Sequence, residues 1–417
     1  MKIGELLFKF FAARAPRVRG FTNRFYFAHP FLDAWFAWFP LNQIQYGGAS
    51  VGEIYNVASR IDERSSESWT NEWFAEGRRL EKYAERLHNS GHARSSALAS
   101  LRAYTYYRTA HLATDPVTSG GAMKETYAAL KRCFLAYAQN GPRTIEPVLV
   151  PYEQRDMAGY LMRPKTNDGV PRATILWLNG AETISEDMLW WCGAEGVARG
   201  FNVFCVDMPG DTATRIERPS LVLNNPGDTA LKAQLDYLCA HPEVEPHNIF
   251  VYGISMGGYK AARLAGLDNR PRAVVANAPM LNASQVLSEV RNTSKMNKNA
   301  RGWAYRMLWQ YGIDDHSNLK HAVEQLVDEV WGTFRTDPES VRVPFLTLVG
   351  ENELGGEGLR QAREFHRRVP SVEKAERITT FSEGAEAHCQ LNNFPLARQI
   401  VFDWFEDHLS PSKKGEV

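Results

Sequence analysis

The feature that most restricts the fold of this chain is a regular alternation of two segment types after Pro142. Short runs rich in β-branched and aromatic residues are separated by stretches long enough for a helix. Strands that alternate with helices predict βαβ units, because parallel neighbours need a crossover connection. We expect strands at 145–150, 173–178, 202–206, 249–252, 273–276, 345–349 and 377–381, and helices at 187–199, 228–240, 258–265 and 395–409. This order predicts a mostly parallel sheet flanked by helices.

The residues before Pro142 show a different periodicity. Apolar side chains recur every three or four positions over 69–87, which is typical of a helix with one buried face. Gly91 follows this helix and suits the left-handed conformation of a C-terminal cap. Further helices are expected over 97–112 and 123–138. We therefore predict a helical N-terminal segment at residues 1–141 and an α/β domain at 142–417, with a helical excursion over the sheet edge at about 282–340.

A glycine-rich turn separates the strand at 249–252 from the helix at 258–265. It reads Gly253-Ile254-Ser255-Met256-Gly257, a Gly-x-Ser-x-Gly pattern. A serine on such a sharp turn needs glycine two residues to either side, because neighbouring segments leave no room for a Cβ. The turn lifts the hydroxyl above the sheet and directs the N-terminus of the next helix at it. We predict that Ser255 is a nucleophile and that the domain has the α/β-hydrolase fold. The alternative is an ordinary glycine-rich turn.

A base and an acid are expected later in the chain, in the order serine, acid, histidine. His388 lies between the last predicted strand and the last predicted helix, and is preferred as the base over a loop histidine without a role. The acid should follow the strand at 345–349, where Glu353 stands three residues after Gly350. Glu351 and Glu357 are the alternatives. A carboxylate at this position orients the imidazole and stabilises its cation.

An oxyanion formed by attack on a carbonyl needs two backbone N–H donors. The N–H of Met256 directly follows the nucleophile, and the N–H of Ala181 lies in the loop after the strand at 173–178. Glu182 is the alternative to Ala181 as donor. Asp207 ends another strand, and we interpret it as a brace for the loops.

Composition narrows the possible partners. Lys plus Arg and Asp plus Glu both number 48, so the net charge is zero and no nucleic-acid partner is expected. The longest aromatic stretch, at 31–39, is too short to span a bilayer, so we expect no membrane partner. The five cysteines include no CxxC pair, which favours a reducing compartment, and we predict a cytoplasmic protein. No metal cluster or phosphate-binding loop is recognisable, so no metal or cofactor is expected.

Three segments resemble one group of α/β-hydrolases: Leu178–Thr183, Gly253–Gly258 and Gly384–Gln390. The group is related to 2,6-dihydroxypseudooxynicotine hydrolase. It includes fungal heptaketide hydrolyases of pigment synthesis and the fermentation–respiration switch proteins, which are esterase-like. The resemblance extends to the N-terminal helices around Leu101–Arg108, which are similar to the group's cap. It implies cleavage of carbon–carbon bonds beside ketones, a helical cap over the pocket, a homodimer, and a catalytic role for Glu182. Glu353 departs from the group, which usually has aspartate there.

Residues and resemblance together predict a serine hydrolase with an N-terminal helical cap that cleaves a ketone-bearing small molecule, polyketide-like or aromatic. Three alternatives remain open: a carboxylesterase, an acyl transferase or cyclisation catalyst with the same triad in secondary metabolism, and a binding protein without activity. Glu182 also has a structural alternative, because it precedes the helix expected near Ser185–Asp187 and an acid commonly caps a helix there.

Overall fold

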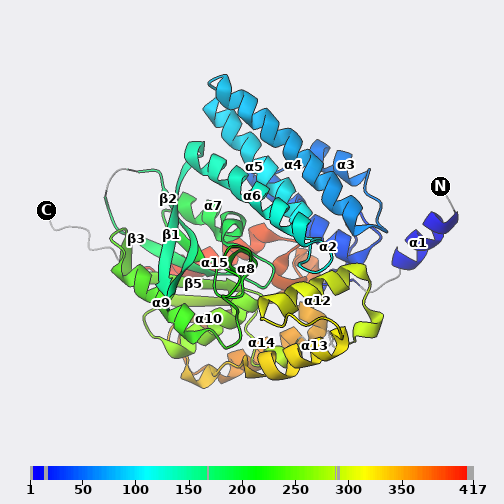
Figure 1. Cartoon of the computed structure of the whole chain (residues 1–417). Coiled ribbons are helices and arrows are strands. Elements are labelled where there is room, and N and C mark those ends of the chain that lie inside the picture. The colour runs from blue at the N-terminus through cyan, green and yellow to red at the C-terminus, as the bar shows by residue number, and fades with distance from the viewer. Residues whose placement is uncertain (1–2, 14–16, 167–168, 287, 289–291, 411–417) are drawn as a thin grey trace.

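The computed structural model describes residues 3–13, 17–166, 169–286, 288 and 292–410, and its centre is an eight-stranded sheet (Figure 1). The strand order is β1-β2-β4-β3-β5-β6-β7-β8. β2 is antiparallel to both of its neighbours, and the strands from β4 to β8 are parallel to one another. The strands are β1 (Arg143–Tyr152), β2 (Arg155–Pro164), β3 (Arg172–Leu178), β4 (Asn202–Val206), β5 (Val244–Ile254), β6 (Ala273–Asn277), β7 (Phe345–Gly350) and β8 (Lys374–Thr379). The prediction of a mostly parallel sheet is confirmed.

Both faces of the sheet are buried, which explains the nearly continuous apolar runs of the central strands. Along β3, Ile175 and Trp177 belong to one hydrophobic core, whereas Leu176 and Leu178 belong to the other. The first face is covered by α7 (Ala194–Ala198) and α15 (Phe394–Asp407), and the second by α9 (Asp228–Ala240), α10 (Met256–Leu267) and α14 (Glu357–Arg368). Helices on both faces place the carboxyl ends of the strands at one open edge, where the loops of the candidate site meet.

The N-terminal helical region packs above this sheet. Its helices are α2 (Pro30–Trp38), α3 (Val51–Ala58), α4 (Ser66–Asn89), α5 (Ala93–His111) and α6 (Gly120–Asn140). Helices α4 and α5 form a long antiparallel hairpin that extends from the body of the protein (Figure 1). Trp69 and Trp73 lie fully buried on the inner face of α4. A buried ion pair, Arg108 to Asp187 at 2.8 Å, joins α5 to the sheet domain. The predicted helical N-terminal region is therefore present.

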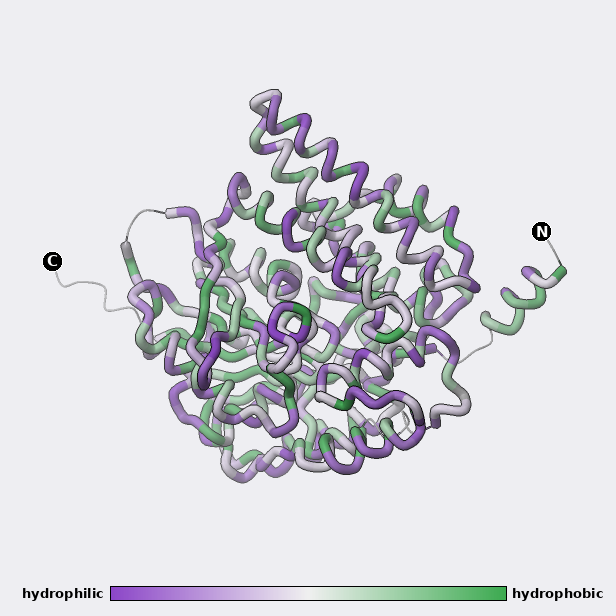
Figure 2. Tube along the Cα trace, viewed as in Figure 1, coloured by the Kyte–Doolittle hydropathy of each residue, from purple (hydrophilic) through white to green (hydrophobic). Residues whose placement is uncertain are grey.

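Helix α1 (Ile3–Ala13) stands apart from the rest of the fold and is largely apolar along its length (Figures 1 and 2). Between β6 and β7 the chain forms α11 (Ala283–Val286), α12 (Lys298–Gln310) and α13 (Leu319–Gln325), together with short 3₁₀ and π turns. These elements enclose a separate core that reaches Met256. None of the helices in the described residues combines the length and the apolar character that crossing a membrane requires.

Two elements differ from the sequence-based expectation. Strand β2 was not predicted, because Arg155–Pro164 contains no Val, Ile or Thr. The segment predicted as one helix at 187–199 is divided into a 3₁₀ turn at Ser185–Asp187, a π turn at Leu189–Gly193, and α7. At Gly193 an added Cβ would press against the Met162 sulfur of β2. The irregular turns therefore lie where this segment packs closely against β2.

Candidate active site

Ser255 occupies the sharp turn between β5 and α10. Its backbone has φ 55° and ψ −121°, a conformation that L residues rarely adopt and that is typical of a nucleophile on such a turn. A Cβ on Gly253 would overlap the Gly257 carbonyl, and a Cβ on Gly257 would overlap the carbonyl of Leu178. The Ser255 N–H donates to the Asn277 carbonyl at 2.6 Å. The two glycines therefore permit the turn, and the neighbouring strand fixes it.

His388 lies beside the serine, in the loop that follows β8. Its Nε2 is 3.0 Å from Ser255 Oγ, and its Nδ1 forms a short hydrogen bond with Glu353 Oε1. Burial opposes protonation of the imidazole, but the Cys389 sulfur and the Glu353 carboxylate outweigh it and raise the pKa of His388. The three side chains form one continuous chain of contacts, as a serine, a base and an orienting acid require.

The three glutamates considered as the acid have different surroundings. Glu353 is buried, and its second carboxylate oxygen accepts from the Cys389 N–H at 3.3 Å. Glu351 accepts from the Phe381 N–H at 2.5 Å. Glu357 binds the guanidinium of Arg360 at 2.7 Å. The structure therefore brings Glu353 to His388 and directs the other two to different partners.

The two backbone groups expected to hold an oxyanion lie near the serine. Ala181 and Met256 line the same cavity as Ser255 and His388. The Ala181 carbonyl accepts from Gln310 Nε2 at 2.8 Å, which fixes the loop after β3. Asp207 braces the same loop: its carboxylate accepts from Asn179 Nδ2 at 2.9 Å and from the Ser185 hydroxyl at 2.6 Å, as expected.

Glu182 forms an ion pair with Arg19 and lines the cavity of Ser255. Burial opposes ionisation of its carboxyl group, but the guanidinium groups of Arg19 and Arg306 outweigh it and lower the pKa of Glu182. Glu182 is thus held as a carboxylate. At the start of the short helix, the Ile184 N–H donates to the carboxylate of Asp187 at 3.2 Å.

A segment that the sequence analysis did not select crosses this site. We call residues Arg17–Thr22 the N-terminal strap. The Arg19 carbonyl accepts from the His388 N–H at 2.8 Å, and its guanidinium pairs with Glu182. Thr22 N–H donates to Glu386 Oε1 at 3.0 Å. The strap therefore contacts both the loop of His388 and the loop after β3. No local sequence pattern signals these contacts, because the partners are far apart along the chain.

The cavity above Ser255 has a volume of about 1080 Å³. Its wall combines the strap, the loop after β3, the excursion between β6 and β7, and the loop after β7; representative lining residues are Phe21, Phe31, Glu182, Met280, Trp331 and Leu354. Most of these side chains are apolar, which suits a small organic substrate. In the described residues, Glu353, His388 and Cys389 bring possible metal-ligand atoms within 4.8 Å of one another, but the imidazole already binds Ser255 and Glu353.

This fold, with its cavity at the carboxyl edge of a mostly parallel sheet, defines an α/β-hydrolase. The family model of FrsA-like esterases matches residues 56–301, and the chain belongs to this family. The hydrolyase poxO of Penicillium oxalicum is 25% identical, over 73% of this chain and 79% of that protein. The 20-hydroxy-prefusarin hydrolase FUS2 of Gibberella moniliformis is 23% identical, over 66% of this chain and 67% of that protein.

Among solved structures, 2,6-dihydroxy-pseudo-oxynicotine hydrolase is similar in fold. Its TM-score is 0.70 at 18% identity, with 90% of this chain and 97% of that chain covered. The resemblance inferred from the sequence is thus confirmed. The chain is an enzyme of the hydrolase class, related to fungal hydrolyases.

Proposed function

We propose that this enzyme hydrolyses a carbon–carbon bond beside a ketone in a small polyketide-like or aromatic substrate, with Ser255 as nucleophile, His388 as base and Glu353 as orienting acid. One observation supports it above the others. The contact chain from Ser255 through His388 to Glu353 opens into the cavity that Glu182 also lines. The name of one related fungal protein, 20-hydroxy-prefusarin hydrolase, gives that protein an organic compound as its substrate, which is consistent with a small-molecule substrate here.

The proposed reaction begins with attack of Ser255 Oγ on the ketone carbonyl, as His388 Nε2 takes the hydroxyl proton. The N–H groups of Met256 and Ala181 hold the oxyanion of the tetrahedral intermediate. Collapse of the intermediate breaks the carbon–carbon bond, and the imidazolium returns its proton to the leaving carbanion or enolate. Water, deprotonated by His388, then attacks the acyl-serine and releases the acid. Glu353 keeps the imidazole in the tautomer that each of these transfers needs.

Glu182 has a role in this proposal that ester hydrolysis does not require. A carbanion is a much poorer leaving group than an alkoxide, so the bond breaks only when charge on the leaving fragment is stabilised or removed. A fixed carboxylate can accept a proton or a hydrogen bond from a hydroxyl of that fragment and so favour its reactive tautomer. The pairing with Arg19 keeps Glu182 ionised and fixed in place for this task.

The experiment replaces Glu182 by glutamine and compares two substrates, an aryl 1,3-diketone and p-nitrophenyl acetate. We expect diketone cleavage to fall about 100-fold or more, as for loss of a general base, while ester hydrolysis remains substantial. Ser255→Ala should abolish both activities and the labelling by a fluorophosphonate. Glu351→Gln is the matched control, because Glu351 lines the same cavity but binds the Phe381 N–H.

Equal loss of both activities in Glu182→Gln, with an unchanged melting temperature, would contradict the role of Glu182 and favour a carboxylesterase. Full fluorophosphonate labelling of Ser255→Ala would remove Ser255 from the mechanism.

We further propose that residues 1–141 act as the cap of the catalytic domain at 142–417. The positions of Phe21 and Phe31 in the cavity wall support this proposal. The homodimer implied by the resemblance stays a prediction.

A further inference from the structure

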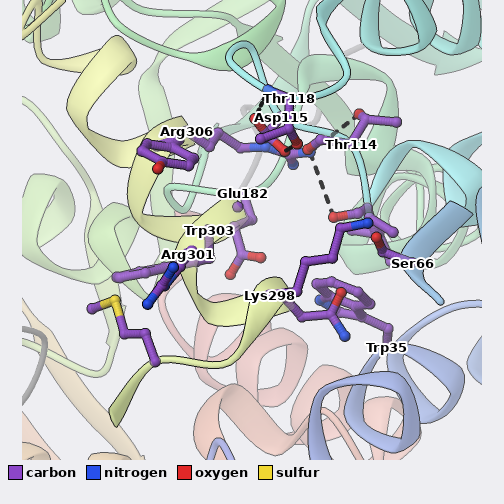
Figure 3. Close-up of a pocket in the computed structure, with 16 residues that line it drawn as sticks. Trp35, Ser66, Thr114, Asp115, Thr118, Glu182, Lys298, Arg301, Trp303 and Arg306 are labelled. Atoms are coloured by element: carbon purple, nitrogen blue, oxygen red, sulfur yellow. Dashed lines mark hydrogen bonds between the residues drawn. The ribbon is translucent and has the colours of Figure 1, made fainter. Parts of the chain in front are cut away.

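A second cavity adjoins the one above Ser255. It has a volume of about 280 Å³ and lies between α12 and the turn that follows α5. Glu182 and Trp303 line both cavities. Figure 3 shows the Glu182 side chain pointing into the second cavity, between Arg301 and Lys298. Glu182 therefore forms part of the boundary between the two cavities.

The side chains around the second cavity carry more positive than negative charge. Lys298, Arg301 and Arg306 line it, together with two acids, Asp115 and Glu182. Both acids are already engaged. Asp115 accepts from the backbone N–H of Val117 at 2.9 Å and from that of Thr118 at 2.7 Å, and Glu182 pairs with Arg19. The cavity therefore offers donors and positive charge to a ligand.

Arg306 is the buried cation among these residues, with 2% of its surface exposed. Its Nη2 donates to the backbone carbonyls of His111 and Thr114, which satisfies one end of the guanidinium. Among the residues that the structure describes, no carboxylate lies within ion-pair distance of it, although the nearby carboxylates of Glu182 and Asp115 partly offset the effect of burial on its pKa. Burial lowers its pKa to about 10, so it stays charged at neutral pH. A buried cation without a directly bonded anion is costly, and a ligand anion reduces that cost.

Trp35 lines the same cavity and is also 2% exposed. Its indole N–H is buried without a hydrogen-bond acceptor. Other tryptophans of this protein share that feature, but Trp35 borders a space that a ligand can enter. Trp35 and Arg306 thus line a single cavity, and the indole N–H is a buried donor without an acceptor.

We propose that this cavity is a binding subsite for a carboxylate at the end of the substrate remote from the bond that is cleaved. Arg306 and Trp35 bind the carboxylate oxygens, and Arg301 and Lys298 lie at the cavity wall as further cations. The inference rests on the proposed function, since it places the reacting carbonyl at Ser255. Glu182 lies between the two ends of the substrate, and its carboxylate is paired with Arg19.

The test uses two activated esters with the same six-carbon acyl chain. One is the mono-p-nitrophenyl ester of adipic acid, which ends in a carboxylate, and the other is its neutral methyl ester. We expect the wild-type enzyme to favour the acid in kcat/KM by about tenfold, as for a charge-assisted hydrogen bond. Trp35→Phe removes the N–H together with the pyrrole part of the indole, and it should abolish most of this preference through a higher KM. Arg306→Gln should abolish it as well.

Trp404→Phe is the matched control, because its indole N–H also lacks an acceptor but Trp404 lies on α15, away from this cavity. If Arg306→Gln does not fold, the preference of Trp35→Phe for the acid over the neutral ester still tests the subsite. Equal turnover of the two esters by the wild type, or an unchanged preference in Trp35→Phe, would overturn the subsite. Turnover of the neutral ester and fluorophosphonate labelling are measured on the same proteins. If the wild-type enzyme neither hydrolyses the neutral ester nor is labelled by the fluorophosphonate, the proposed function is contradicted instead.

Discussion

Replacing Glu353 by glutamine removes one negative charge and hardly changes the size of the side chain. The carboxylate is 1% exposed, and its two oxygens contact His388 Nδ1 and the Cys389 N–H. An amide here can present its N–H₂ group to the imidazole and so favour the tautomer whose proton lies on Nε2. In that tautomer, the nitrogen that faces Ser255 Oγ at 3.0 Å cannot take a proton.

We expect kcat for p-nitrophenyl acetate to fall by roughly 10⁴-fold, the loss known when the orienting acid of a serine protease becomes an amide. Glu351→Gln should lose far less, because Glu351 binds the Phe381 N–H instead of the imidazole. The measurements are steady-state hydrolysis and the rate of fluorophosphonate labelling, each with a melting curve. A loss below tenfold in Glu353→Gln, or a greater loss in Glu351→Gln, would refute this assignment.

The pH dependence gives a second measurement on the same variants. Only the neutral imidazole accepts the serine proton, so the rate rises as pH passes through the pKa of His388. Although burial opposes protonation, Cys389 and Glu353 raise this pKa above the ordinary value of about 6.5. The acid limb of the wild type should therefore lie above pH 6.5. In Glu353→Gln it should move to lower pH, because burial remains and the carboxylate is lost.

The remaining predictions concern stability. Deletion of residues 1–140 should give aggregated protein in size-exclusion chromatography. The deletion exposes the sheet to solvent and leaves the buried Asp187 without its partner Arg108. A monodisperse truncated protein with unchanged substrate preference would contradict the role of these residues as a cap. Gly257→Ala should lower the melting temperature strongly or prevent folding, because the new Cβ would overlap the Leu178 carbonyl. Gly121→Ala is the control and should leave the melting temperature unchanged, because Gly121 has open space around it. Equal melting temperatures of the two variants would contradict this prediction.

Local signals account for the part of the fold that the sequence predicts. The nucleophile turn, β4 and α9 are each encoded by a short stretch whose pattern is unambiguous. Strand β2 lacks such a pattern, and its conformation depends on pairing with β1 and β4. At Gly159 an added Cβ would overlap the Cys205 carbonyl of β4. The strand conformation of β2 therefore depends on its close packing against β4 and not on the strand propensity of its residues.

In the candidate site, too, some residues have a local sequence signal and others do not. Ser255, His388 and Glu353 were selected because each follows a strand at a set position, and the sheet brings such positions together. Arg19 precedes every strand and lies in no periodic segment, so its pairing with Glu182, 163 residues away, has no local signal. The charge state of Glu182 depends on that contact, which is why sequence reasoning left its role open.

The N-terminal strap has a consequence for the order of folding. Thr22 and Glu386 are 364 residues apart, so their hydrogen bond closes a loop that contains most of the chain. Closing a longer loop costs more conformational entropy, and contacts of long sequence separation tend to form late. During synthesis, the sheet up to β7 can assemble while the loop of His388 is still absent. In the proposed mechanism, the hydroxyl of Ser255 therefore meets its base only after the loop of His388 has been synthesised, and the growing chain lacks this pair of side chains until then.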